Sequence, residues 1–120
     1  MSLMGKRAVI TGGGSGIGAD MALAFAQAGA DVTITGRREA ALQTVADQHD
    51  AISFAVVNVT DEAAMVAFFE NIGRVDIVIA NAGAAESAPF AKTSFEQWQR
   101  MLNVNLSGVF LTLREGLKQL

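Results

Sequence analysis

Glycines, arginines and asparagines are the residues whose spacing gives this chain a capacity for chemistry. Residues 11–18 read Thr-Gly-Gly-Gly-Ser-Gly-Ile-Gly and stand between a β-branched run and a helical pattern. Glycines in such a turn adopt backbone angles that other residues avoid, and the missing Cβ lets a diphosphate approach the main chain. The start of the following helix adds free N–H groups and a positive dipole end. The cluster predicts a dinucleotide phosphate site, the alternative being a glycine loop without a ligand.

A second group of residues follows the next apolar run, where the sequence reads Gly36-Arg37-Arg38. A carboxylate at this place binds the ribose 2′-hydroxyl of NAD and repels a 2′-phosphate, whereas a guanidinium holds a phosphate with paired hydrogen bonds. The arginine pair therefore favours NADP as the cofactor, with NAD possible. The alternative is that both arginines form a solvated first turn of a helix.

Strand and helix patterns alternate along the chain and would position these groups. Short apolar or β-branched runs predict strands at 7–11, 31–35, 52–57 and 75–80, and helical spacing predicts helices after residue 18, at 39–49, at 60–73 and at 94–120. Thr60 and Ser94 are the expected N-caps of the last two helices. This alternation predicts a Rossmann-type, doubly wound parallel sheet with strand order 3-2-1-4 and helices on both faces, a three-layer α/β/α fold that is incomplete in this chain.

Three motifs of the chain resemble those of the short-chain dehydrogenase/reductase family. Residues 11–18 resemble its Thr-Gly-x-x-x-Gly-x-Gly signature, and Asn81-Ala82-Gly83 resembles its Asn-Asn-Ala-Gly motif, with Ala80 in place of the first Asn. Asn105 matches the asparagine of the family's long fourth helix. The resemblance runs from Lys6 onward and implies an oxidoreductase that transfers hydride between nicotinamide and a carbonyl or secondary alcohol.

The resemblance also implies a set of cofactor-binding residues. Asn58 stands where the family has an Asp that contacts the adenine amino group; its carboxamide oxygen is able to accept that hydrogen bond, although Asn58 is equally suited to ending the strand. Ser15 counts against NADP, because many NADP-dependent relatives carry a basic residue there. The full expected set is Thr11, Gly12, Gly14, Ser15, Gly16, Ile17, Gly18, Arg37, Arg38, Asn58, Val59, Asn81, Ala82 and Gly83.

Catalysis is represented in this chain by one expected residue, Asn105, which in the family disturbs its helix locally and holds a water of the proton relay. The alternative is a buried asparagine bonded to backbone. The family's catalytic Tyr, Lys and Ser lie in the second half of its domain, and this chain contains no tyrosine. We therefore expect residues 1–120 to be the N-terminal portion of a longer single-domain enzyme, inactive alone. A non-catalytic dinucleotide-binding or assembly module is the alternative.

Composition narrows the remaining function classes. The net charge of -3 is scattered rather than clustered, which is untypical of nucleic-acid or membrane-surface binding. There is no cysteine and a single histidine, so no metal site is expected. The N-terminus lacks a signal pattern, which predicts a cytoplasmic protein, and Met4 indicates that residues 1–3 precede the natural start. An apolar stripe on the helix at 94–120 predicts a homo-oligomer, dimer or tetramer.

Overall fold

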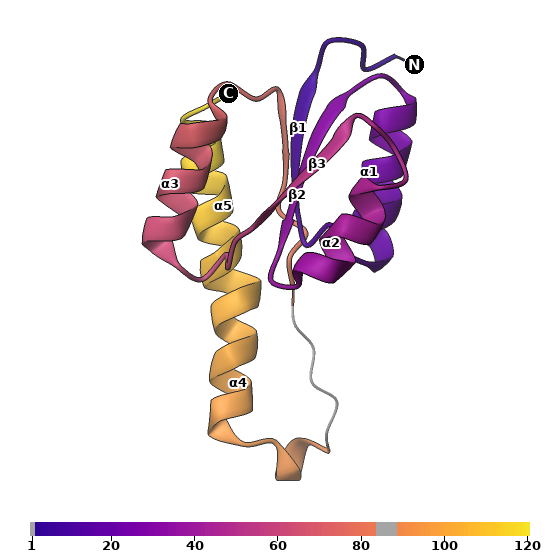
Figure 1. Cartoon of the computed structure of the whole chain (residues 1–120). Helices are drawn as coiled ribbons and strands as arrows, with labels where there is room; N and C mark the ends of the chain where they lie inside the picture. The colour runs from indigo at the N-terminus through magenta and orange to yellow at the C-terminus, as the bar shows by residue number, and fades with distance from the viewer. Residues whose placement is uncertain (1, 84–88) are drawn as a thin grey trace.

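The computed structural model describes residues 2–83 and 89–120, which form a parallel sheet between two layers of helices. Strands β1 (Arg7–Thr11), β2 (Asp31–Gly36), β3 (Ile52–Val56) and β4 (Ile77–Ile79) lie in the order β3-β2-β1-β4. Helices α1 (Gly16–Gln27) and α2 (Glu39–Ala46) cover one face, and α3 (Glu62–Ile72) and α5 (Gly108–Leu117) cover the other (Figure 1). The predicted fold class and strand order are confirmed.

Strand β1 is the centre of the sheet and is buried on both faces. It pairs in parallel with β2 and β4, so that Val9 lies opposite Thr33 on one side and Val78 on the other. Ala8 and Ile10 of β1 belong to the core cluster under α1 and α2. Val9 belongs to the other cluster, with Met65 and Phe69, under α3 and α5. A central parallel strand is expected to be apolar on both faces for this reason.

Several helix boundaries differ from the prediction: α1 begins at Gly16, within the glycine cluster, and the last helix ends at Leu117 rather than at residue 120. The N-cap of α3 is Asp61, whose carboxylate accepts a hydrogen bond from the Ala64 N–H at 3.0 Å, and Thr60 lies in the preceding turn. Helix α2 ends at Ala46 rather than at His49, since the amides of Gln48 and His49 bond to carbonyls three residues back and turn the chain toward β3. The predicted strands also shorten: β3 ends at Val56 and β4 covers only Ile77–Ile79.

The predicted long helix is continuous but contains an irregular turn. It consists of α4 (Phe95–Leu102), the π-helical turn η2 (Asn103–Ser107) and α5, and a short 3-10 helix η1 (Phe90–Lys92) precedes it. Ser94 and Gln97 form the expected capping box at its start. The α4 half extends away from the sheet (Figure 1). In the part of the chain that the structure describes, no helix has the length and apolarity to span a bilayer.

Helix α5 lies on the sheet through small residues, not through its apolar stripe. A Cβ on Gly116 would stand 3.0 Å from a methyl group of Val78, so the glycine permits the close approach. Leu111 is buried in the core beneath the helix, whereas a second set of large apolar residues is exposed at spacings of three and four, which places them on one helix face. This exposed stripe comprises Phe95, Trp98, Leu102, Leu106, Phe110, Leu113 and Leu117, and Leu120 is exposed just after the end of α5.

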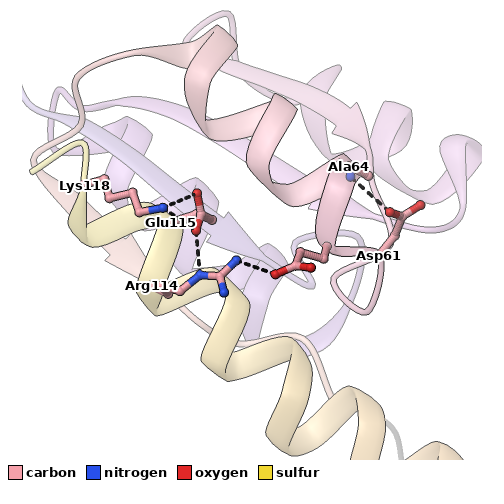
Figure 2. A network of polar contacts seen from close by, with 6 residues as sticks. Asp61, Ala64, Arg114, Glu115 and Lys118 are labelled. Carbon is pink, nitrogen blue, oxygen red and sulfur yellow. Dashed lines mark hydrogen bonds and ion pairs between the residues drawn. The ribbon is translucent and has the colours of Figure 1, made fainter.

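A polar network ties α5 to α3 at the edge of the core. The Glu115 carboxylate, only 3% exposed, accepts hydrogen bonds from Lys118 at 2.9 Å and from the Arg114 Nε at 2.7 Å. Arg114 also donates to Glu62 of α3 at 2.8 Å (Figure 2). The Lys118 and Arg114 hydrogen bonds hold the pKa of Glu115 below its ordinary value of 4.5, against the opposing effect of burial.

The network makes stability dependent on acid pH. Because the pKa of Glu115 is lowered in the folded state, its contribution is fully present above the ordinary value of 4.5 and is lost as pH falls through the folded pKa. We expect the melting temperature to drop over that acidic range, and Glu115→Gln to be less stable at neutral pH with a smaller drop. Thermal melts from pH 7 to pH 2 measure this, with the exposed Glu70→Gln as matched control. Parallel curves for the wild type and Glu115→Gln would contradict the assignment.

Candidate functional site

A cavity of about 350 Å³ opens at the carboxyl ends of the strands. It lies at the point where the chain crosses from the β1–β2–β3 side of the sheet to β4, the place at which open parallel sheets bind ligands. Its volume is at the lower end of the range for small-molecule sites. Its lining residues are Gly12, Gly14, Ser15, Gly36, Arg37, Arg38, Ala41, Leu42, Val57, Asn58, Val59, Ala82, Gly83 and Val104.

The glycine turn forms one wall and leads directly into α1, as predicted. Gly12 and Gly16 have φ of 67° and 56°, the left-handed region that favours glycine. A Cβ on Gly12 would stand 2.8 Å from the Cα of Ala82, and one on Gly18 would collide with the carbonyl oxygen of Gly12. Ser15 is the N-cap of α1, and its side chain makes no capping hydrogen bond. The glycines therefore let the turn close on itself and on the segment after β4, and the start of α1 beside it provides helix N–H groups for an anion.

Thr11 and Asn81 hold these two walls of the cavity together. The buried Thr11 hydroxyl accepts hydrogen bonds from the backbone N–H groups of Asn81 at 3.0 Å and Ala82 at 3.1 Å. The Asn81 side chain donates to the carbonyl oxygen of Gly12 at 3.1 Å. Neither residue is part of the cavity lining, and both hold the glycine turn against the segment after β4.

Arg37 and Arg38 line the cavity from the end of β2, on the same side of it as Gly14 and Ser15 of the glycine turn. Both side chains are exposed, and Arg38 is the N-cap of α2. Two guanidinium groups beside a phosphate cradle provide positive charge and planar sets of donors, which suit a further phosphate group.

Asn58 and Val59 line the cavity from the end of β3, as predicted, but the orientation of Asn58 differs from the expectation. Its Oδ1 accepts hydrogen bonds from the backbone N–H of Thr60 at 3.0 Å and from the Thr60 hydroxyl at 2.7 Å. The oxygen that was expected to face adenine is thus directed at Thr60. Val59 is buried against Gly108 of α5 and forms part of the cavity floor.

Asn105 lies within the π-helical turn η2, so the predicted local disturbance of the helix is confirmed. The Asn105 side chain is exposed in the described part of the chain. Its Oδ1 would be 3.1 Å from a Cβ built on Gly83, so the helix and the segment after β4 approach closely here. π-helical turns are frequent at functional sites.

The structure brings most of the predicted residues together around one cavity. The predicted residues that do not line the cavity are Thr11, Gly18 and Asn81, which lie behind its wall, and Gly16, Ile17 and Asn105. Ile17 is 73% exposed. Sequence reasoning missed the apolar residues of the lining, some of which are sequence neighbours of predicted site residues. These residues are Gly36, Ala41, Leu42, Val57 and Val104.

A parallel sheet with a glycine-rich first turn and a cavity at its switch point defines a Rossmann-type dinucleotide-binding fold. A family model of short chain dehydrogenases matches residues 6–120, so the chain belongs to that family. It is 39% identical to an NADP-dependent (R)-specific alcohol dehydrogenase of Lentilactobacillus kefiri, over 98% of this chain and 50% of the relative. The chain thus spans about half the length of the curated relatives it matches.

Solved structures give the same fold over the same portion. A 3-ketoacyl-(acyl-carrier-protein) reductase from Brucella melitensis, complexed with NADH, matches with a TM-score of 0.92 and 36% identity, over 98% of this chain and 51% of the other. A gluconate 5-dehydrogenase from Burkholderia cenocepacia, in complex with NADP and tartrate, matches with a TM-score of 0.87 and 34% identity, over 98% and 49%. Both are bound to nicotinamide dinucleotides.

Replacing the Thr11 hydroxyl is expected to destabilise the cradle. Thr11→Val keeps the shape but removes the acceptor of the Ala82 N–H, whereas the Asn81 N–H retains its hydrogen bond to the Ile79 carbonyl oxygen at 3.1 Å. Leaving the Ala82 N–H without an acceptor costs about 1–3 kcal/mol of unfolding free energy. Thr11→Ser keeps the hydroxyl and loses only a methyl group, a cost of about 1 kcal/mol. Urea denaturation of the three proteins measures the difference. Equal stability of the Val and Ser variants would show that the hydroxyl does not hold the walls.

Proposed function

We propose that this chain is the dinucleotide-binding portion of an NADP-preferring oxidoreductase that transfers hydride between nicotinamide and a carbonyl or secondary alcohol. The observation that carries the proposal is the single cavity that joins a glycine cradle at a helix start to Arg37 and Arg38. The NADP named for the Lentilactobacillus and Burkholderia relatives supports the cofactor, and NAD remains the second possibility.

Each wall of the cavity has a distinct task in this proposal. The N–H groups at the start of α1 bind the diphosphate, and the arginines bind the 2′-phosphate. Ala82 and Gly83 lie at the end of β4, where the small side chain and the missing Cβ let the nicotinamide ribose approach the backbone. The bound cofactor supplies or accepts the hydride.

Asn105 is the one relay residue of the proposal within residues 1–120. A π-helical turn leaves backbone carbonyls without their regular helical partners, and the exposed Asn105 side chain stands beside Gly83. This arrangement suits a carbonyl oxygen and an amide that together hold a water and pass a proton. The Tyr, Lys and Ser that the family uses are proposed to lie beyond Leu120 in the full protein.

A non-catalytic dinucleotide-binding or assembly module is the second candidate, because the glycine turn and the cavity would serve dinucleotide binding with or without catalysis. Sequence downstream of Leu120 separates the two functions. A Tyr-x-x-x-Lys there supports the enzyme, and a continuation without it supports the module.

Cofactor titration tests the proposed preference. We expect NADPH to bind more tightly than NADH, as measured by nicotinamide fluorescence. Arg37→Ala and Arg38→Ala should each weaken NADPH binding by roughly tenfold or more, since a charge-assisted hydrogen bond is worth about 1.5–3 kcal/mol. Binding of NADH should change little.

Arg74→Ala is the matched control, because Arg74 is a strongly exposed arginine that does not line the cavity. Equal affinities of the wild type for NADPH and NADH would contradict the assignment of the arginines to a 2′-phosphate. An absence of binding by either cofactor would contradict the dinucleotide site itself.

We further propose that the chain self-associates through the helix at 94–120. The exposed stripe defined above is contiguous along α4, η2 and α5, and exposed apolar surfaces of this extent mark interaction sites. A pairing of two such helices buries the same face of both copies, as a two-fold dimer requires.

Light scattering tests the self-association. The wild type should have the mass of a dimer or tetramer, and Leu113→Glu should shift it toward the monomer because a charge is buried in the helix pair. Val56→Glu, at an equally exposed valine on β3, is the control and should leave the mass unchanged. A monomeric wild type would count against the proposal.

A further inference from the structure

The Asn58 side chain has a fixed orientation at the edge of the cavity. A backbone N–H is able only to donate, so the group that faces the Thr60 N–H at 3.0 Å must be the carboxamide oxygen. The Thr60 hydroxyl donates to the same oxygen at 2.7 Å. A carboxamide oxygen has two lone pairs, and both are used by these bonds. What Asn58 has left to offer is its NH2 group, with two donors and no acceptor.

The place of Asn58 in the cavity determines what it meets. With a diphosphate on the turn after β1 and a 2′-phosphate at Arg37 after β2, the adenosine half of a dinucleotide runs along the sheet edge toward β3. The side chains at that end of the cavity are Asn58 and the apolar Leu42, Val57 and Val59. The apolar residues suit the faces of a planar base, and Asn58 is the polar group at hand for its edge.

We propose that Asn58 recognises the base as a hydrogen-bond donor, so that the site accepts a 6-oxopurine at least as well as adenine. This inference rests on the proposed dinucleotide function. Adenine carries an amino group at position 6, which is itself a donor and gains nothing from a facing NH2 group. Hypoxanthine carries a carbonyl oxygen there, which accepts. Adenine is still able to accept a hydrogen bond from Asn58 at a ring nitrogen, but its amino group then finds no acceptor at this residue.

An aspartate at position 58 would reverse this selectivity. A carboxylate has two oxygens, of which one accepts the Thr60 hydrogen bonds and the other remains an acceptor for the adenine amino group. It would repel the oxygen of hypoxanthine. Asn58→Asp therefore preserves the turn at Thr60 while replacing the free donor by a free acceptor.

The test compares NADPH with reduced nicotinamide hypoxanthine dinucleotide phosphate by fluorescence titration, and the readout is the ratio of the two dissociation constants. The wild type should bind the hypoxanthine cofactor as tightly as NADPH or more tightly. Asn58→Asp should prefer NADPH by roughly tenfold or more, the worth of a hydrogen bond to a charged group. The added charge weakens both cofactors alike through the phosphates, and the ratio removes that effect.

Asn58→Ala is the second variant and should bind both cofactors more weakly with a ratio near one. Thermal melts confirm that each variant folds. A wild type that prefers NADPH tenfold or more, or a ratio that Asn58→Asp leaves unchanged, would overturn the donor assignment while leaving the dinucleotide site intact. A wild type that binds neither cofactor would instead overturn the proposed function on which this inference rests.

Discussion

The close contact between the glycine turn and the segment after β4 is the constraint on which the rest of this structure depends. A Cβ on Gly12 would collide with Ala82, and a Cβ on Gly18 would collide with the carbonyl oxygen of Gly12. The Thr11 hydroxyl then fixes the distance by accepting two backbone hydrogen bonds from beyond β4. These contacts bring the ends of non-consecutive strands to one cavity, so the site is a product of the tertiary fold and not of the glycine motif alone.

Glycines also permit a close contact on the face of the sheet that α5 covers. Gly108 and Gly116 let α5 lie against Val59 and Val78, and the buried Glu115 is satisfied by cations of its own helix. Leu111 joins the core beneath the helix together with these small and polar residues, and the large apolar residues of the stripe lie on the outer face. The helix is thus packed on one side only, against the sheet and α3, and its outer side carries the exposed stripe.

The features that the sequence predicts well are those encoded by neighbouring residues. The glycine turn, the capping box at Ser94 and the alternation of strands and helices depend on local propensity, and the strand order follows from the Rossmann type that they indicate together. The errors arise where a distant or competing contact decides. Asp61 rather than Thr60 caps α3 because Thr60 is bonded to Asn58. The apolar stripe of the last helix is predicted, but its outward direction depends on the glycines of α5 that meet β4 and the turn after β3.

In the site, the positions of charged groups could be predicted from the sequence, whereas the orientation of a polar side chain could not. Positive charge at the end of β2 could be predicted from residue types alone, because a guanidinium attracts a phosphate from many orientations. The role of Asn58 could not, since a carboxamide has a donor end and an acceptor end and only the Thr60 contacts determine which is free. Asn58 is exposed at the mouth of the cavity, so its NH2 group bonds to water until a base displaces that water. The NH2 group therefore affects affinity mainly through the difference between its hydrogen bonds to different bases. Recognition by charge and recognition by a directed donor therefore act on separate parts of the same ligand.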